Sequence, residues 1–378
     1  MPVVRVYSSL EVGGIERQLL QLLPRLQARG RYRTTLILTR RAGALAPDLQ
    51  RAGVPVEVLP LRGRFAPRAL ATLAGRFRAL GAQIVHSHVY EDNARSTVAS
   101  WFAGRPPVIA CVHSLGVTRG ARRRLQERAL GYCRAAVVCV SDKVRHNYLE
   151  TVGGPADRAV VLYNGVDVRA IQALPRDRAG VRAEFGLAET AVVIVCAARL
   201  IPDKDHGLLL DAFAAVAARH PSAFLVLAGG GPSEARLRER CAAADLHGRV
   251  VLAGSRSDVP RLLRAADLSV LASRREGFSN VVLESLAAGT PLVVTDVGGN
   301  REAMEGERCG RVVPAGDAPA FAAALDALLG DGDLREELAR QAAERAWRFD
   351  LERTADETEA LYAAVLARHR RRRAGTPA

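Results

Sequence analysis

Long apolar runs, paired cysteines and lysine are all scarce in this sequence of 378 residues. No apolar run approaches the roughly 18 residues that a membrane-spanning helix requires, which argues against an integral membrane protein. The N-terminal segment MPVVRVYSSL lacks the basic start and long apolar stretch of a secretory signal. We therefore expect a cytoplasmic protein, with peripheral contact at the inner face of the plasma membrane left open by the charge distribution described below.

Several familiar motifs are also missing. The six cysteines form no CxxC pair, and several stand inside apolar runs such as VIACVH, so we expect small buried side chains. Neither GxGxxG after the first strand nor GxxxxGK[ST] occurs, which weakens dinucleotide-binding and P-loop interpretations. Nothing resembles a helix-turn-helix, a zinc finger or an RNA-binding motif, so nucleic acid is not an expected partner.

The basic residues are 52 arginines and only two lysines, Lys143 and Lys204. In so arginine-rich a chain, Lys204 indicates a position that needs a compact ammonium group. Residues 1–170 hold 26 basic and 11 acidic side chains, whereas residues 171–378 hold 28 and 29. The net charge of +14 therefore lies in the first half, which either meets an acidic partner such as an anionic membrane or reflects the arginine-rich composition.

Short β-branched runs alternate with helix-length amphipathic stretches, first between residues 3 and 164 and again between 192 and 314. Continuous apolar strands alternating with helices predict parallel sheets covered on both faces. Two such series predict an α/β chain with two facing, doubly wound domains. We expect the boundary near Asn164–Asp167, a polar stretch over 176–186, and helix throughout from about Gly332 to Arg373 with a solvated basic tail.

The most informative segment runs from Arg274 to Gly299. A short loop carries Glu276, and Ser279 is placed to cap a helix that begins at Asn280. Free backbone N–H groups at such a helix start suit an anion such as a diphosphate. Glu276 and Glu284, eight residues apart, would then accept hydrogen bonds from sugar hydroxyls; a surface carboxylate pair and a glycosidase-like acid and base are the alternatives.

Charged side chains also follow the first strand of the second half, within AARLIPDKD. Arg199 at the strand end and Lys204 in the next loop are placed to neutralise a phosphate pair, although either could be an ordinary loop charge. Glycine pairs at strand ends allow close backbone approach. His86, His88 and His113 end strands as well; His86 and His88 share a strand face, but no third and fourth metal ligands are evident.

Taken together and in order, VGGIERQLL, CVH, YNGVD, AARLIPDKDHGLLLDAF, LAGGGP and EGFSNVVLESLAAGTPLVVTDVGG resemble the family-4 retaining glycosyltransferases of GT-B fold. The resemblance spans essentially the whole chain. It implies an acceptor-binding Rossmann-like domain over 1–167, a nucleotide-sugar-binding domain over 168–350, and a C-terminal helix over 351–378 that crosses back to the first domain. One departure is Asp205, where many relatives have a glycine after the lysine.

The resemblance also implies site residues. It makes Arg199, Lys204, Glu276 and His113 the catalytic set, with His113 near the transferred sugar and the loop 254–258 near the base. The donor-binding set that it implies is Gly13, Gly14, Arg199, Lys204, Gly254, Ser255, Arg256, Glu276, Gly277, Phe278, Ser279, Asn280, Val281, Val282 and Glu284.

No nucleophilic carboxylate is placed by these motifs, so the family's front-face substitution, without metal or other cofactor, is the expected mechanism. We expect a UDP-sugar donor before a GDP- or ADP-sugar, and a glycan or lipid-linked acceptor. The alternatives are a nucleotide-sugar epimerase or hydrolase of the same fold, or a binding module without turnover.

Overall fold

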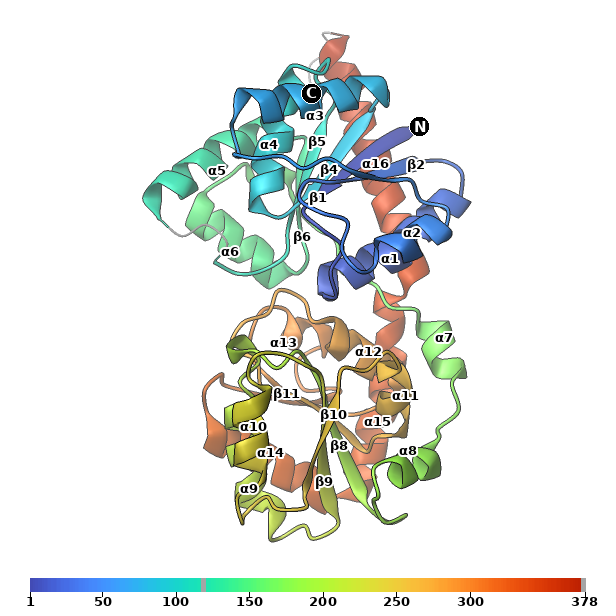
Figure 1. Cartoon of the computed structure of the whole chain (residues 1–378), viewed down its shortest axis with the longest axis vertical. Helices are drawn as coiled ribbons and strands as arrows, with labels where there is room; N and C mark the ends of the chain where they lie inside the picture. The colour runs from blue at the N-terminus through green and yellow to red at the C-terminus, as the bar shows by residue number, and fades with distance from the viewer. Residues whose placement is uncertain (117–119, 375–378) are drawn as a thin grey trace. The chain divides into compact units, whose positions relative to one another are not determined.

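The structure, a computed structural model, describes residues 1–116 and 120–374 and divides into two compact units (Figure 1). The first unit joins Met1–Gly165 to the C-terminal segment that begins at Leu351, and the second is Val166–Asp350. Each unit is a parallel sheet between helices. This arrangement confirms the predicted α/β fold class.

In the first unit the strands lie in the order β3-β2-β1-β4-β5-β6-β7, and every neighbouring pair is parallel. Its strands are β1 (Pro2–Tyr7), β2 (Arg33–Leu38), β3 (Val56–Val58), β4 (Ile84–His88), β5 (Val108–Val112), β6 (Ala136–Cys139) and β7 (Ala159–Val161). Its helices are α1 (Gly14–Ala28), α2 (Ala46–Arg51), α3 (Pro67–Ala79), α4 (Tyr90–Trp101), α5 (Ala121–Cys133), α6 (Asp142–Val152), η1 (Ala156–Arg158) and α16 (Leu351–Arg373).

In the second unit the order is β10-β9-β8-β11-β12-β13, again with parallel neighbours. Its strands are β8 (Val192–Ala197), β9 (Ala223–Ala228), β10 (Val250–Gly254), β11 (Leu268–Leu271), β12 (Leu292–Thr295) and β13 (Gly310–Val313). Its helices are α7 (Val168–Ala173), α8 (Arg178–Glu184), η2 (Pro202–Lys204), α9 (His206–Ala217), α10 (Glu234–Cys241), α11 (Val259–Ala265), α12 (Asn280–Ala288), α13 (Asn300–Ala303), α14 (Ala318–Gly330), α15 (Gly332–Ala346) and η3 (Trp347–Phe349).

The last helix, α16, is part of the first unit's core. Leu351 and Ala355 pack with leucines of α1, and Tyr362, Val365 and Leu366 pack against strand residues of β1, β4, β5 and β6. Arg29, at the end of α1, donates to Glu352 and Asp356 on α16 at 2.6 Å each. The C-terminal helix therefore completes the hydrophobic core of the first unit although it follows the whole second unit in sequence.

The expectation of unbroken helix from Gly332 to Arg373 is wrong. The chain leaves helical geometry between α15 and α16, where Phe349 is buried in the second unit and Leu351 in the first. Val166 donates its N–H to the carbonyl of Phe349 at 2.9 Å, and Asp350 is extended. The break is thus where the chain passes between units. The helix then continues to Arg373, and its basic residues Arg368, Arg370, Arg371 and Arg372 are exposed, as expected of a solvated tail.

The polar stretch 176–186 is partly helical, and the expectation that the cysteines are small buried side chains needs correction. The stretch 176–186 contains the helix α8, whose start is capped by Asp177 accepting from Gly180 N at 3.1 Å and which buries Val181. The cysteines are all free, but Cys133 is exposed and Cys241 only half-buried. No helix in the described part of the chain combines the length and the apolar character needed to cross a membrane.

Candidate functional site

The strand order of the second unit fixes where a ligand can bind. From β8 the sheet continues to β9 on one side and to β11 on the other, so the loops after β8 and β11 diverge at this point. Ligands of doubly wound sheets bind in the crevice at such a switch point, beside the carboxyl ends of the strands. Arg199 and Lys204 lie in the loop after β8, and Glu276 lies in the loop after β11.

Lys204 and Glu276 meet across the switch point. The ammonium Nζ forms an ion pair with the Glu276 carboxylate, whose Oε1 also accepts a hydrogen bond from Ser273 Oγ at 2.7 Å. Only 18% of the Lys204 side chain and 11% of the Glu276 side chain are exposed. An ammonium group has three donors, so Lys204 can hold this carboxylate and still donate to a ligand oxygen.

The loops that carry this pair are held to each other at three further points. Arg274 Nε donates to Asp205 Oδ2 at 2.6 Å, Arg275 Nη2 donates to Asp203 Oδ1 at 2.9 Å, and Arg274 N donates to the Asp203 carbonyl at 2.8 Å. The two arginines shield the lysine loop, and their role is not evident from the sequence. Side-chain and backbone contacts therefore join the two loops.

Asp205 explains the departure from the family pattern. Its φ of 45° and ψ of 47° are left-handed, the region that favours glycine, and aspartate is one of the few other residues that enter it readily. The Arg274 ion pair offsets part of the backbone cost. Asp205 thus has a backbone conformation that a glycine would adopt without strain.

The helix after the Glu276 loop begins as predicted, but its cap differs. Helix α12 starts at Asn280, and its first helical hydrogen bond runs from Leu283 N to the Ser279 carbonyl at 3.3 Å. The Ser279 side chain makes no capping hydrogen bond, so that expectation is wrong. The backbone N–H groups of Val281 and Val282 precede the first helical bond, and a ligand anion can take the place of a side-chain cap there.

Neighbouring loops support the same helix start. Gly299 N donates to the Gly277 carbonyl at 2.8 Å, and Gly298 has a left-handed φ of 54°. A Cβ at Gly298 would lie 2.6 Å from the Glu276 carbonyl oxygen. Phe278 packs edge to face with Phe349, with ring centroids 5.3 Å apart. Glu284 is half-buried farther along α12.

The Gly229–Gly231 segment packs against the backbone that carries Arg199. Leu200 N donates to the Gly230 carbonyl at 2.9 Å, and a Cβ at Gly229 would overlap the Ala198 carbonyl oxygen. A Cβ at Gly230 would lie 2.6 Å from Ser255 Oγ, which brings the loop after β10 to the same edge. The glycines therefore allow the loops after β8, β9 and β10 to converge around the exposed Arg199.

Arg256 is engaged by protein carboxylates. It donates to both oxygens of Asp258 at 2.8 Å each, and its Nη2 lies 2.7 Å from Glu184 Oε1. These contacts orient the loop that begins at the left-handed Gly254. Contact of Gly254, Ser255 and Arg256 with a nucleotide base stays a prediction.

The other predicted site residues lie at the carboxyl edge of the first sheet. Gly14 begins α1. Glu16 of that helix accepts a hydrogen bond from Tyr7 OH at 2.8 Å, and a Cβ on Gly13 would overlap the Glu16 carboxylate. His113 follows β5 and is half-buried. Burial and the nearby Arg5 guanidinium lower the pKa of His113 to about 4, so its ring is neutral at pH 7.

Cys111 joins His86 and His88 in a buried group whose ligand atoms lie within 4.8 Å of one another, so the structure supplies a third ligand that the sequence did not suggest. The rings are already engaged: His86 Nε2 meets Cys111 Sγ at 2.9 Å, and His86 Nδ1 meets Tyr362 OH at 2.8 Å. The Arg5 guanidinium lies 3.3 Å from His88 Nε2 and would repel a cation. These residues fit a hydrogen-bonded cluster better than a metal.

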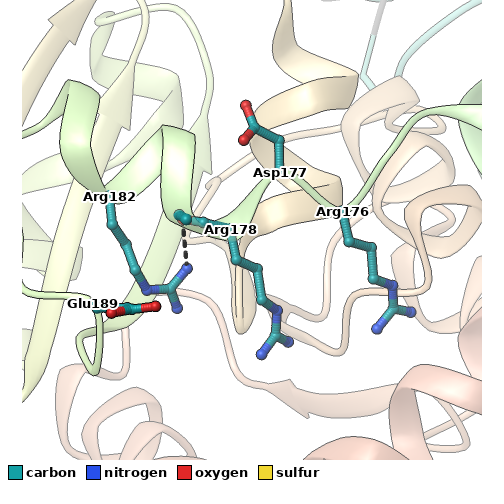
Figure 2. A pocket seen from close by; sticks show the side chains of 6 residues that line it. Arg176, Asp177, Arg178, Arg182 and Glu189 are labelled. Atoms are coloured by element: carbon teal, nitrogen blue, oxygen red, sulfur yellow. Dashed lines mark hydrogen bonds between the residues drawn. The ribbon is translucent and has the colours of Figure 1, made fainter.

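A cavity of about 440 Å³ lies elsewhere in the second unit, lined by Arg176, Asp177, Arg178, Ala179, Arg182 and Glu189 (Figure 2). Arg182 donates to the Ala191 carbonyl just before β8 and to Asp267 just before β11, at 2.9 and 2.7 Å. The cavity is therefore at the amino ends of the strands, opposite the edge where such sheets bind ligands.

Comparison with known proteins identifies this architecture. Residues 177–345 match the family model described as glycosyl transferases group 1, and residues 12–170 match glycosyltransferase family 4. The structure of Anabaena HepE in complex with UDP superimposes with a TM-score of 0.86 at 23% identity, covering 96% of this chain and all of that one. A glycosyltransferase from Rickettsia africae gives 0.86 at 19% identity, covering 97% and 98%. The fold is that of the GT-B glycosyltransferases.

The sequence relatives agree with the fold. A D-inositol 3-phosphate glycosyltransferase of Acidothermus cellulolyticus is 30% identical over 399 residues, 95% of this chain and 87% of that protein. A phosphatidyl-myo-inositol mannosyltransferase of Mycolicibacterium smegmatis is 29% identical over 360 residues, 91% and 88% of the two chains. This chain belongs to the glycosyltransferase family that the group 1 and family 4 models describe.

We predict that Gly229→Ala lowers the free energy of unfolding of the second unit by about 2 kcal/mol or more, because its Cβ must displace the backbone at Ala198. Gly207→Ala is the matched control: in α9 its Cβ meets nothing within 4 Å, and we expect a gain of about 0.4–1 kcal/mol. Urea denaturation followed by circular dichroism measures both. Equal effects of the two substitutions would contradict the packing of the glycine loop described above.

Proposed function

We propose that this glycosyltransferase moves a sugar from a UDP-sugar, bound by the second unit, to a glycan or lipid-linked acceptor bound by the first, with retention at the anomeric carbon. The observation that carries the proposal is the meeting of Lys204 and Glu276 at the switch point of the second sheet, next to Arg199 and the start of α12. In this proposal the two cations, the carboxylate and the helix amides bind the nucleotide-sugar together.

Each group has a distinct task in this proposal. Arg199 and Lys204 bind the diphosphate and stabilise the charge that grows on it as the glycosidic bond breaks. The amides of Val281 and Val282 add the positive end of the α12 dipole. Glu276 is held by Lys204 and Ser273 with one carboxylate oxygen, Oε1, and offers the other to sugar hydroxyls. Glu284 would accept from the ribose.

The proposed substitution takes place on one face of the sugar. The departing phosphate oxygen takes the proton of the acceptor hydroxyl as the new bond forms and the old one breaks. The groups assigned here bind and neutralise, and none of them serves as a covalent nucleophile. Retention, the UDP donor and independence from metal are parts of the proposal; that Anabaena HepE was crystallised with UDP and with UDP-glucose supports the donor.

The excess of basic residues in the first half of the chain supports an anionic acceptor. The named substrates of the two relatives, inositol 3-phosphate and phosphatidyl-myo-inositol, carry phosphate. The excess of basic residues lies in the first half of this chain, and Arg122, Arg123, Arg124 and Arg128 are exposed on α5. Leu125 of the same helix is 69% exposed. Arg119, which belongs to the same sequence cluster, lies outside the described residues. We therefore propose peripheral contact of α5 with an anionic membrane.

We predict that Arg199→Ala and Lys204→Ala each lower turnover about 10²-fold without loss of fold, since one transition-state charge contact contributes about 3 kcal/mol. Nucleotide release from candidate UDP-sugars measures turnover. Arg219→Ala, an exposed arginine just after the other end of α9, is the control and should keep full activity. Near-native turnover in both site variants would overturn the assignment. In wild type, release of the nucleotide distinguishes sugar transfer from epimerisation and from binding without turnover.

We predict full activity in excess EDTA, because the side-chain cations and helix amides supply the positive charge at the diphosphate. The assay compares initial rates with EDTA, with Mg²⁺ and with Mn²⁺ after chelation. A rate that collapses with chelator and returns with either ion would show that the diphosphate is bound through a metal.

We predict that the protein sediments with vesicles containing anionic lipid and that 0.5 M salt releases it, because exposed arginines near such a surface contribute about 1 kcal/mol each before screening. Replacing Arg122, Arg123 and Arg124 by Ala should abolish sedimentation. A triple Ala variant at Arg51, Arg308 and Arg340, which already pair with neighbouring carboxylates, removes equal charge and should still bind. Equal binding to neutral vesicles would favour a small soluble acceptor instead.

A further inference from the structure

A buried arginine stands in the middle of the first strand of the first unit. Arg5 is 2% exposed in the otherwise apolar β1, and among the described residues no carboxylate pairs with it. Its Nη1 donates to His88 Nε2 at 3.3 Å, and its Nη2 donates to Tyr362 OH at 2.7 Å. A buried guanidinium is costly, so these two contacts need an explanation beyond packing.

The first contact fixes how His88 carries its proton. A guanidinium has donors only, so His88 Nε2 must accept, and the neutral ring carries its hydrogen on Nδ1. That Nδ1 lies 3.0 Å from His113 Nε2 and therefore donates to it. His113 Nε2 is then an acceptor, which leaves the hydrogen of the neutral His113 ring on Nδ1.

The second contact fixes the other histidine of the strand in the opposite sense. Tyr362 OH accepts from Arg5 and so turns its own hydrogen to His86 Nδ1, 2.8 Å away. His86 then carries its proton on Nε2, which donates to Cys111 Sγ at 2.9 Å. One guanidinium thus determines the hydrogen-bond direction along both branches of the cluster.

We propose that Arg5 is a positioning residue that holds His113 in the Nδ1–H form, so that His113 presents a hydrogen-bond donor, and not a base, at the carboxyl edge of the first sheet. The inference rests on the proposed function for the meaning of that donor: it would bind an oxygen of the transferred sugar or of the acceptor. No described residue pairs with His113 Nδ1, so this N–H remains for a ligand.

The charge states agree with this assignment. Burial is the largest cause that lowers the pKa of His86 and of His88 well below the ordinary value. Arg5 comes next at His86, whereas the neighbouring rings precede Arg5 at His88, and burial and Arg5 lower the pKa of His113. All three rings are therefore neutral at pH 7, and each carries one ring proton whose position the hydrogen bonds decide. A neutral donor can bind a sugar oxygen without adding positive charge beside a leaving phosphate.

The test is the tautomer of each ring, read from ¹⁵N shifts and two-bond ¹H–¹⁵N correlations of the full chain labelled at histidine. Wild type should show Nδ1–H at His88 and His113 and Nε2–H at His86. Arg5→Met removes the donor and should give a mixture of both tautomers at His113, with kcat/KM lowered up to about tenfold. Tyr362→Phe is the control: it should change His86 and leave His113 unaltered.

An Nε2–H form of His113 in wild type, or an unchanged His113 in Arg5→Met, would overturn the proposal. Should Arg5→Met fail to fold, the wild-type tautomers and Tyr362→Phe still decide. The spectra are recorded without a sugar donor or a sugar acceptor. If the tautomers are as assigned but the protein transfers no sugar, that result counts against the proposed function and not against the role of Arg5.

Discussion

The ion pair between Lys204 and Glu276 is the contact on which the proposed donor site depends. It joins the loops after β8 and β11 where the sheet's topology makes them diverge. Exposed ion pairs contribute little, about 0–1 kcal/mol, but this one is mostly buried and Ser273 fixes the carboxylate. Arg274 and Arg275 add more exposed contacts between the same two loops.

Steric constraints on glycine explain why the surrounding loops can come so close. The segment at Gly229 lies directly against the Ala198 carbonyl, and Gly298 lies against the backbone of Glu276. Side chains at these positions would push the loops outward and separate the cations from the start of α12. The loops therefore come this close only because these positions carry no side chain. In the first unit, hydrogen bonds from the buried Arg5 join β1 to β4 and α16.

Much of the fold could be predicted because most of the buried parallel strands are rich in apolar and β-branched residues, and the expected runs all appear as strands. The residues brought together at the switch point could be predicted from their places at strand ends. Helix α8 was missed because its charged sequence hides the cap made by Asp177. The break before α16 depends on Phe349 and Leu351 entering different units, which no local pattern reveals.

The Arg5 cluster shows a second limit of sequence reasoning. Arg5 and Tyr362 are 357 positions apart, so only the fold brings them into contact. The one sequence signal was an arginine inside an apolar strand. By contrast, the scarcity of lysine did single out Lys204, because a chain that uses arginine almost everywhere else keeps an ammonium group there.

The central claim, that Arg199 and Lys204 hold a nucleoside diphosphate, is tested most directly by calorimetric titration of UDP in the presence of EDTA. We predict that wild type and Arg219→Ala bind UDP with the same Kd. We predict that the Kd rises about 10- to 100-fold in Arg199→Ala and in Lys204→Ala, because a charged hydrogen bond contributes about 1.5–3 kcal/mol. The same Kd for all four proteins would contradict the account.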